Sequence, residues 1–288
     1  MRLALGTVQF GVPYGIANQF GQVSRDEVQS ILNFSLINKI DTLDTAIAYG
    51  ESEKCLGEIG VQNFNLVTKL PEIPNNCSNI NAWVFNQVEA SLSRLRITKL
   101  YGLLLHQPYQ LLDHLAPNLY QALQGLKEMG LVEKIGISVY SPDDLARIVP
   151  QFRLDLVQAP FNFIDQRLYK SGWMQRLKDD EIEIHSRSTF LQGLLLMQQK
   201  DMPSKFYRWN HLWQSWHQWL EANNLSALQA CLDFSLSFSE IDKVIVGVDS
   251  QAQLIQILRF VDNNSAVSFP NFACDDQQLI NPVNWNAL

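Results

Sequence analysis

The sequence lacks any long hydrophobic run. No stretch of its 288 residues approaches the roughly 18 apolar residues that a membrane-spanning helix needs, so we expect no membrane partner. The first residues, Met1 to Thr7, also lack the long apolar segment and the small-residue cleavage site of a signal peptide. Both absences favour a cytoplasmic protein.

Cysteine, glycine and positive charge are also scarce. The four cysteines, at positions 55, 77, 231 and 274, are scattered without a C-x-x-C pair, which predicts free thiols and no metal site. Only 14 residues are glycine, so no glycine-rich phosphate loop dominates the chain. With 22 basic and 29 acidic residues the net charge is −7, which argues against a nucleic-acid partner.

What the sequence does contain is an alternation of strand-like and helical segments. Stretches with apolar residues at helical spacing separate eight short apolar runs. Two helix starts are marked by an S-x-x-E capping box at Ser24 and by Ser141 followed by Pro142. The apolar runs are Leu3–Thr7, Ile40–Ala46, Leu66–Leu70, Leu100–Leu105, Lys134–Val139, Leu154–Ala159, Ile182–Ser186 and Val244–Val248.

Repeated strand–helix units imply a parallel sheet. Eight such units, with no glycine-rich dinucleotide fingerprint after the first run, favour an α/β fold of the (β/α)8 TIM-barrel type. An open, doubly wound sheet is the alternative. Because no linker divides the chain, we expect residues 1–288 to form a single domain, with an irregular, polar tail from about residue 262.

Polar residues stand where a barrel would carry its active site. Barrel enzymes use the carboxyl ends of strands and the loops that follow them. Asp44, Lys69 and His106 lie at the ends of the second, third and fourth runs, and Tyr49 lies in the loop after the second. A purely structural alternative exists, in which Asp44 and Lys69 are an ion pair closing the barrel and His106 is a satisfied buried histidine. Four polar residues on adjacent strand ends favour a shared site, because buried polar groups need partners.

Together these four side chains predict the chemistry of carbonyl reduction. A phenol has an ordinary pKa of about 10 and is a poor proton donor near neutrality, but a neighbouring ammonium lowers that pKa. Asp44 would keep Lys69 in place and charged, and His106 would orient a carbonyl oxygen. The assembly would protonate a developing alkoxide, while the hydride has to come from a cofactor.

The residues around Tyr49 also carry a family resemblance. The segment 44–53, DTAIAYGESE, followed by Leu56-Gly57, resembles the signature of the aldo-keto reductase family, and further segments in the same order extend the resemblance along most of the chain. It implies a catalytic tetrad of Asp44, Tyr49, Lys69 and His106. It also implies an NAD(P)H-dependent oxidoreductase that reduces an aldehyde or ketone to an alcohol, with NADPH as the expected cofactor and NADH as the alternative.

The same resemblance implies a cofactor site that departs from the family pattern in places. Arg187 stands where an aromatic residue often stacks on the nicotinamide ring, and Val139 where asparagine is usual. Near the last run, residues that are basic in many members are uncharged here, so a 2′-phosphate would lack its usual charge partner. The cofactor-binding residues implied are Gly6, Thr7, Ser138, Gln158, Arg187, Ser188, Gln192, Gly193, Gly247, Gln253 and Gln256.

Four of the seven tryptophans are close together in the sequence. Trp209, Trp213, Trp216 and Trp219 fall on one stripe of a helix, which favours a helix that packs its aromatic face on the barrel. The alternative is an aromatic wall over the substrate mouth, formed by Trp209 with Phe206 and Tyr207 and suited to a sugar-derived carbonyl.

Two other functional classes stay open. One is a catalytically weak or inactive barrel that binds a nicotinamide cofactor as a sensor or accessory protein. The other is a metal-dependent hydrolase or isomerase, which needs several histidine and carboxylate ligands, whereas only His106 and His185 qualify here. For the main hypothesis we expect a small-molecule carbonyl substrate and a monomer or weak homodimer.

Overall fold

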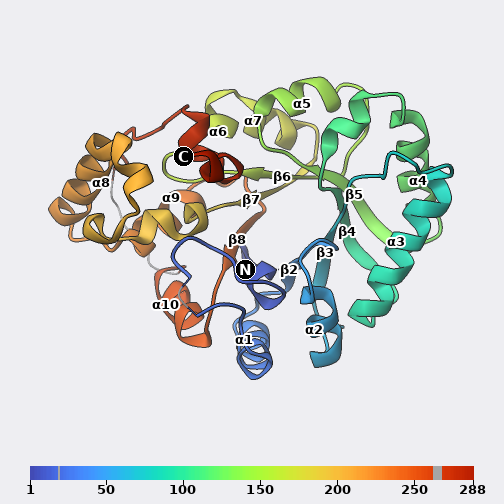
Figure 1. The fold of residues 1–288 in the computed structure, drawn as a ribbon, viewed down its shortest axis with the longest axis horizontal. Helices are drawn as coiled ribbons and strands as arrows, with labels where there is room; N and C mark the ends of the chain where they lie inside the picture. Colours follow the sequence, from blue (N-terminus) through green and yellow to red (C-terminus); the bar gives the residue numbers. More distant parts are fainter. Residues whose placement is uncertain (19, 262–267) are drawn as a thin grey trace.

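The computed structural model describes residues 1–18, 20–261 and 268–288. Eight parallel strands close into a barrel in sequence order, and the last strand bonds to the first. Helices surround this central barrel (Figure 1). The strands are β1 (Leu3–Gly6), β2 (Thr42–Asp44), β3 (Asn65–Leu70), β4 (Leu100–Leu105), β5 (Val132–Ser138), β6 (Leu156–Pro160), β7 (Glu183–Arg187) and β8 (Lys243–Gly247). The expected single-domain (β/α)8 barrel is therefore confirmed, and the open sheet is excluded.

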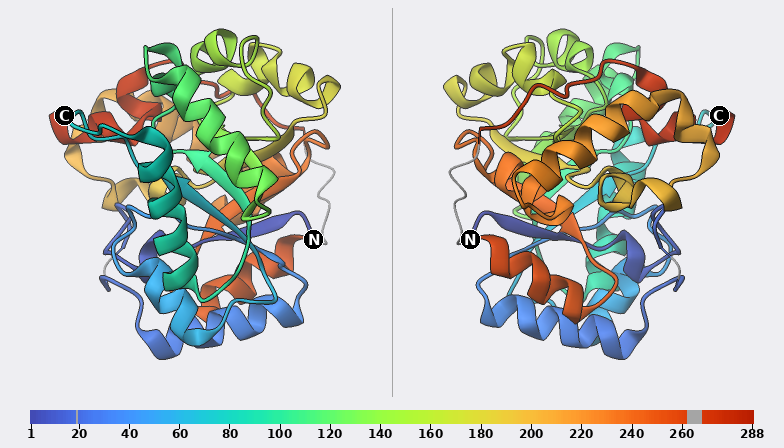
Figure 2. Two further views of the ribbon diagram at one scale, coloured as in Figure 1. Left: turned by 90° about the vertical axis from the view of Figure 1, so that its right-hand side faces the viewer. Right: turned by 90° about the vertical axis from the view of Figure 1, so that its left-hand side faces the viewer.

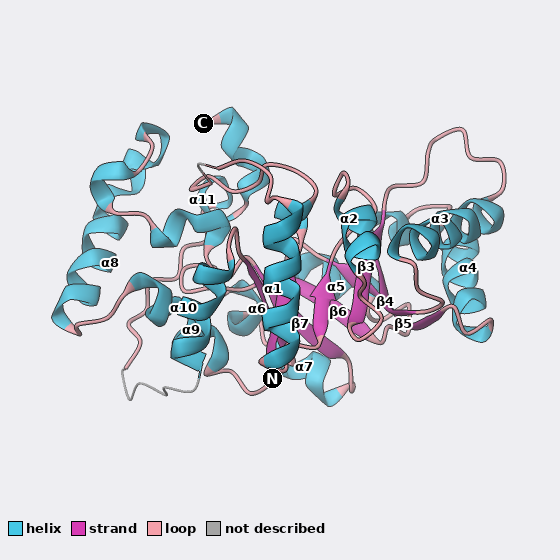
Figure 3. Ribbon diagram, turned by 90° about the horizontal axis from the view of Figure 1, so that it is seen from below, coloured by secondary structure: helices cyan, strands magenta, loops and turns pink. Residues whose placement is uncertain are grey.

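Most of the helices connect consecutive strands and lie outside the barrel (Figure 3). Their bounds are α1 (Arg25–Ile37), α2 (Ser52–Ile59), α3 (Ile80–Leu95), α4 (Ala116–Glu128), α5 (Pro142–Ile148), α6 (Arg167–Lys170), α7 (Trp173–Asp179), α8 (Asn210–Ala222), α9 (Ala227–Leu236), α10 (Gln251–Val261) and α11 (Gln277–Ile280). Both expected helix starts are present. Ser24 accepts the Glu27 N–H, but the Glu27 carboxylate bonds to the Gln251 N–H and the predicted capping box at Ser24 is only half formed. Ser141 forms a reciprocal capping box with Asp144.

One helix differs from the sequence expectation. The apolar spacing predicts a single helix over Leu168–Leu177, but the structure has α6 and α7 instead. Gly172 separates them in the left-handed region, at φ 78°. A left-handed residue ends a right-handed helix, and glycine adopts this conformation without steric strain.

The amino end of the barrel interior contains a polar group of side chains that we call the lower cluster. It consists of Tyr101 on β4, Lys134 on β5, and Glu183 and His185 on β7. Glu183 accepts hydrogen bonds from Tyr101 at 2.7 Å and from Lys134, and it lies 2.7 Å from His185 Nε2. His185 is fully buried. These contacts join β4, β5 and β7 through one carboxylate, which is a structural role.

The tryptophan stripe serves packing. Trp213 and Trp216 on α8 are almost completely buried, and their indole N–H groups donate to the carbonyl oxygens of Phe206 and Leu195. Trp219 stacks on Trp216 with ring centroids 5.8 Å apart. The packing interpretation is confirmed, because indole rings bury a large apolar area and place their N–H on a partner.

The chain after α10 agrees only in part with the irregular, polar tail that the sequence predicts. The predicted start of the tail, at about residue 262, lies outside the described residues, which resume at residue 268. From there the chain is not wholly irregular, since it forms α11 and a short turn over Pro282–Ala287. Trp285 is buried against Phe206, with ring centroids 5.0 Å apart. Across all described residues, no helix combines the length and apolarity needed to cross a membrane.

Candidate active site

A cavity of about 1150 Å³ opens at the carboxyl ends of the strands. Asp44, Tyr49, Lys69 and His106 all line it. Each of the eleven residues expected at the cofactor lines it too. The barrel topology explains this convergence, because the carboxyl ends of parallel strands meet at one rim.

Asp44 and Lys69 form a buried ion pair at the floor of the cavity. Lys69 Nζ donates to Asp44 Oδ1 at 2.7 Å and to the Thr45 carbonyl oxygen at 2.9 Å. The Lys69 side chain is 1% exposed. Burial lowers the pKa of Lys69, and the Asp44 carboxylate opposes that shift. The pair is thus both the structural ion pair foreseen from the sequence and part of the cavity lining.

Gln158 joins this pair from the other side of the barrel. Its amide nitrogen donates to Asp44 Oδ1 at 2.7 Å, and its oxygen lies 3.3 Å from Ser138 Oγ. Gln158 is fully buried. The sequence indicated a cofactor contact for Gln158 and gave no sign of its bond to Asp44, because β2 and β6 are not neighbours in the barrel. We call Asp44, Tyr49, Lys69, His106 and Gln158 the upper cluster.

Tyr49 and His106 lie above the ion pair. Their rings pack edge to face with centroids 6.0 Å apart, and Lys69 Nζ lies 5.1 Å from the centre of the Tyr49 ring. His106 follows the last residue of β4, and its backbone N–H donates to the Leu70 carbonyl oxygen at 3.0 Å. A phenol and an imidazole therefore border the same space.

The pKa of Tyr49 differs from the sequence expectation. Burial raises the pKa of this phenol well above its ordinary value, the Asp44 carboxylate raises it further, and the Arg187 guanidinium lowers it only in part. The pKa of Tyr49 is therefore raised overall and not lowered as the sequence led us to expect, because desolvation dominates. Tyr49 is held as a neutral phenol, the form that can donate a proton.

His106 is held in its neutral form as well. Burial lowers the pKa of His106 to about 4, and the nearby Lys69 ammonium contributes to that shift. Near neutral pH the ring consequently has one N–H donor and one acceptor nitrogen.

Two contacts fix the loop that carries Tyr49. Gly11 lies against this loop so closely that an added Cβ would stand 1.8 Å from the Tyr49 carbonyl oxygen, so no larger residue fits there. On α2, Glu53 is almost completely buried and accepts from Thr68 at 2.7 Å and from Ser91 at 2.6 Å. Arg94 completes this anchor with a 2.7 Å ion pair to Glu53. The sequence motif contains Glu53, but only the structure shows that it ties α2 to β3 and α3.

A comparison of the sequence with protein-family models agrees with the barrel architecture. The model of the aldo/keto reductase family matches residues 2–266.

The chain belongs to the aldo/keto reductase family.

Relatives of this aldo/keto reductase are distant. It is 24% identical over 251 residues to the uncharacterized oxidoreductase YqkF of Bacillus subtilis, a match that covers 80% of each chain. Among solved structures, it resembles aldo-keto reductase AKR11C1 from Bacillus halodurans with a TM-score of 0.73 and 18% identity, over 93% of this chain and 88% of the other. It also resembles the glycerol dehydrogenase AKR11B4 from Gluconobacter oxydans with a TM-score of 0.69 and 20% identity, over 92% and 88% of the two chains. At these identities the structures show the fold alone.

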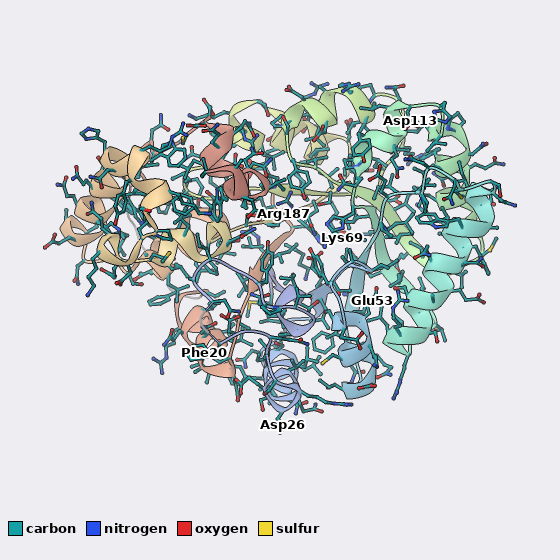
Figure 4. The ribbon with its side chains drawn as sticks, viewed as in Figure 1. Phe20, Asp26, Glu53, Lys69, Asp113 and Arg187 are labelled. Carbon is teal, nitrogen blue, oxygen red and sulfur yellow. The ribbon has the colours of Figure 1, made fainter. Side chains whose placement is uncertain are left out.

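Arg187 places a second positive charge at the centre of this reductase barrel, near Lys69 (Figure 4). Its guanidinium donates to the Val139 carbonyl oxygen at 3.0 Å and lies 4.6 Å from the centre of the Tyr140 ring. Among the described residues no carboxylate pairs with it within salt-bridge distance. Tyr140, which the sequence did not single out, thus shapes the position of Arg187.

Several expected cofactor residues already have protein partners. Thr7 is fully buried, and its hydroxyl donates to the Asp44 carbonyl oxygen at 3.0 Å. Gln192 donates to the Tyr14 hydroxyl at 2.9 Å, and its carbonyl oxygen accepts from the Ile16 N–H at 3.1 Å. These contacts bring the loop after β1 against the loop after β7 at the edge of the cavity. Tyr14 was not foreseen from the sequence, where nothing marks this loop as a neighbour of Gln192.

The opposite wall of the cavity is not aromatic. Phe206 is fully buried and Tyr207 is 57% exposed, but neither lines the cavity, and the described tryptophans do not line it either. Instead α8 presents His217, Leu220 and Glu221. The hypothesis of an aromatic wall is therefore wrong, because the aromatic stripe of α8 faces the protein core.

Proposed function

We propose that this protein is an NAD(P)H-dependent oxidoreductase that reversibly reduces an aldehyde or ketone to an alcohol, with Tyr49 as the proton donor. A protonated phenol and a neutral imidazole border one large cavity, directly above the buried Asp44–Lys69 pair. Membership of an oxidoreductase family supports the same reaction class.

The proposed roles follow from the protonation states. The neutral His106 ring can donate a hydrogen bond to a carbonyl oxygen and fix its position. As negative charge develops on that oxygen, the Tyr49 hydroxyl can donate its proton. Lys69 lies close enough to favour the resulting phenolate, and Asp44 and Gln158 hold Lys69 in place. In the direction of alcohol oxidation the Tyr49 phenolate has to accept the proton and so returns to the phenol.

The residues present fit a nicotinamide cofactor. Gln158 of the upper cluster and its neighbour Ser138 present amide and hydroxyl groups, and Gln9 has a buried Oε1 without a hydrogen-bond partner in the protein. Ser138, Gln158 and Gln9 all line the cavity, whose volume is slightly above the usual range for small-molecule sites. When bound, a reduced nicotinamide would supply the hydride to the carbonyl carbon.

We propose that the substrate is a small-molecule aldehyde or ketone. A sugar-derived carbonyl stays a prediction from the sequence, and it has no support from an aromatic wall in the structure. We also propose that the protein acts in the cytoplasm as a monomer or weak homodimer.

A turnover assay tests the proposal. The protein is mixed with NADH or NADPH and a panel of aldehydes and ketones, and the absorbance of the reduced cofactor is followed. We expect loss of absorbance only with protein, cofactor and carbonyl together. Cofactor binding without turnover of any carbonyl would contradict the enzyme and favour the sensor or accessory protein.

A further inference from the structure

The wall of the cavity between β8 and α10 carries negative charge. The chain from Val244 to Ile257 contains no lysine or arginine, and its single ionisable residue is Asp249, which lines the cavity. The Asp249 carboxylate is half-buried and lies 3.4 Å from the amide nitrogen of Asn18. Among the described residues no cation forms an ion pair with it, and burial raises its pKa.

A second carboxylate occupies the amino end of α10. Helices α1 and α10 lie on the same side of the barrel (Figures 1 and 2), and Glu27 of α1 reaches the start of α10. Glu27 Oε1 accepts the backbone N–H of Gln251 at 2.6 Å. A free helix amino end is a favourable place for a phosphate because its N–H groups lack partners. In α10 a protein carboxylate already fills that place.

Two further N–H groups near this end also have partners. The Asp249 N–H donates to Gln253 Oε1 at 2.7 Å, and the Gln253 N–H donates to the Ser250 hydroxyl at 3.2 Å. A phosphate here would displace these contacts and meet two carboxylates. The lining lysines and arginines among the described residues are Lys69 and Arg187 near Tyr49, and Lys200 on the turn before α8.

The cavity lining offers a dinucleotide a path from Tyr49 to Asp249. Its nicotinamide end has to reach Tyr49, and β8 lies between β7 and β1 in the barrel. The loop after β7, residues 188–193, therefore borders the turn between β8 and α10. Asp249 lines the same cavity as Tyr49 and this loop, so a dinucleotide that extended along the loop would bring its adenosine ribose toward Asp249.

We propose that this wall selects a cofactor without a 2′-phosphate, so that the protein prefers NADH to NADPH. This inference rests on the proposed function. It favours NADH, which the sequence analysis gave as the alternative to NADPH. Asp249 can accept a hydrogen bond from a ribose hydroxyl, as acidic residues do in other NAD sites. The same carboxylate, together with Glu27, repels a 2′-phosphate.

Binding measurements test this without turnover. Dissociation constants for NADH and NADPH are measured by isothermal titration at one ionic strength, because charge effects depend on salt. We expect NADH to bind at least about tenfold more tightly, since each like-charge contact weakens binding. Adenosine 5′-monophosphate and adenosine 2′,5′-bisphosphate repeat the comparison with fragments that differ by the 2′-phosphate alone.

Matched variants connect the preference to the two carboxylates. Asp249→Asn and Glu27→Gln should each strengthen NADPH binding several-fold and leave NADH binding less changed. Asp26→Asn is the control, since Asp26 is exposed on the outer edge of α1 (Figure 4) and should change neither constant. Thermal unfolding of each variant checks that the fold is intact.

The outcomes separate this inference from the proposed function. Equal or tighter binding of NADPH by the unaltered protein overturns the inference and leaves the proposed function standing. A preference that survives both substitutions overturns the role of the carboxylates. If neither cofactor binds, the proposed function fails and this inference fails with it.

Discussion

Two polar clusters lie inside the same barrel, and they differ in what they face. The lower cluster joins Tyr101, Lys134, Glu183 and His185 near the amino ends of the strands, and none of these residues lines the large cavity. The upper cluster joins Asp44 and Lys69 with Gln158 at the carboxyl ends, below Tyr49 and His106, and all five line it.

The chemistry of the two clusters is similar. Each contains a lysine, a carboxylate, a tyrosine and a histidine. In the lower cluster Tyr101, Lys134 and His185 all bond to the one carboxylate. Although burial would raise the pKa of Glu183, bonds from His185 and Lys134 lower it to about 2. In the upper cluster the Tyr49 hydroxyl and the His106 ring have no such shared carboxylate. The difference indicates that free donor groups beside a cavity, rather than the residue types, distinguish a reactive site from a structural one.

The largest expected effect is the loss of turnover when the Tyr49 hydroxyl is removed. Tyr49→Phe should lower kcat roughly 10²–10⁴-fold, because it removes the proton donor. The cofactor dissociation constant and the midpoint of thermal unfolding should stay near those of the unaltered protein. In the lower cluster Tyr101→Phe is the matched control, and it should keep kcat. Equal losses in both variants would remove the distinction between the clusters.

Lys69→Met tests whether the upper cluster also supports the fold. The change leaves the Asp44 carboxylate buried without its charge partner, so the free energy of unfolding should fall by about 3 kcal/mol. Adding Asp44→Asn should restore most of that stability and none of the activity. Denaturant unfolding and turnover, measured on the same samples, give the two readouts. Recovery of activity in the double variant would show that the ion pair is only structural.

Glu183→Gln tests the lower cluster by stability alone. Loss of the shared carboxylate should lower the free energy of unfolding by about 2 kcal/mol, because Lys134 loses its charged partner. Turnover per folded molecule should not change. Glu133→Gln is the control, since Glu133 forms an exposed ion pair with Lys99 and should change stability by less than about 1 kcal/mol. A selective loss of kcat in Glu183→Gln would contradict a purely structural lower cluster.

The smallest expected effect is the change of stability with pH. The two clusters should lose stability in different pH ranges. His106 has a pKa of about 4 in the folded protein and about 6.5 when unfolded, so the unfolded chain binds the proton first as pH falls. Stability should therefore decrease from pH 6.5 to 4 by roughly 2 kcal/mol from this residue. The pKa of Glu183 is about 2 when folded and 4.5 in the unfolded reference, so its contribution is lost between pH 4.5 and 2.

Two variants test which residue causes the loss of stability in each pH range. His106→Gln should flatten the upper range, and Glu183→Gln should flatten the lower one, as measured by denaturant unfolding at each pH. An unchanged slope between pH 6.5 and 4 in His106→Gln would show that the ring is not held neutral by the fold.

Much of the fold could be predicted from local patterns. Eight apolar runs became eight strands with ends shifted by a few residues, because strands buried on both faces require continuous apolar segments. The break at Gly172 was missed because apolar spacing continues across it and outweighs a single glycine. The start of α1 was foreseen from Ser24, whose side-chain bond is local in the chain.

The site was predictable to the extent that it depends on strand ends. Asp44, Lys69 and His106 end adjacent strands, so the barrel rule alone places them together. Gln158 could not be given its role beside Asp44 in the same way, since 114 residues separate the two and no local pattern links them. The same holds for Glu27 at the start of α10, which is 224 residues away.

Sequence patterns alone were enough to predict the barrel, the four polar residues at its rim and the family to which the chain belongs. These depend on the order and spacing of residues along the chain. The tertiary structure decided which groups stay protonated, which amides are already engaged and where negative charge borders the cavity. Those properties depend on burial and on contacts between distant segments, because desolvation and hydrogen bonding act through space and leave no periodic signal in the sequence.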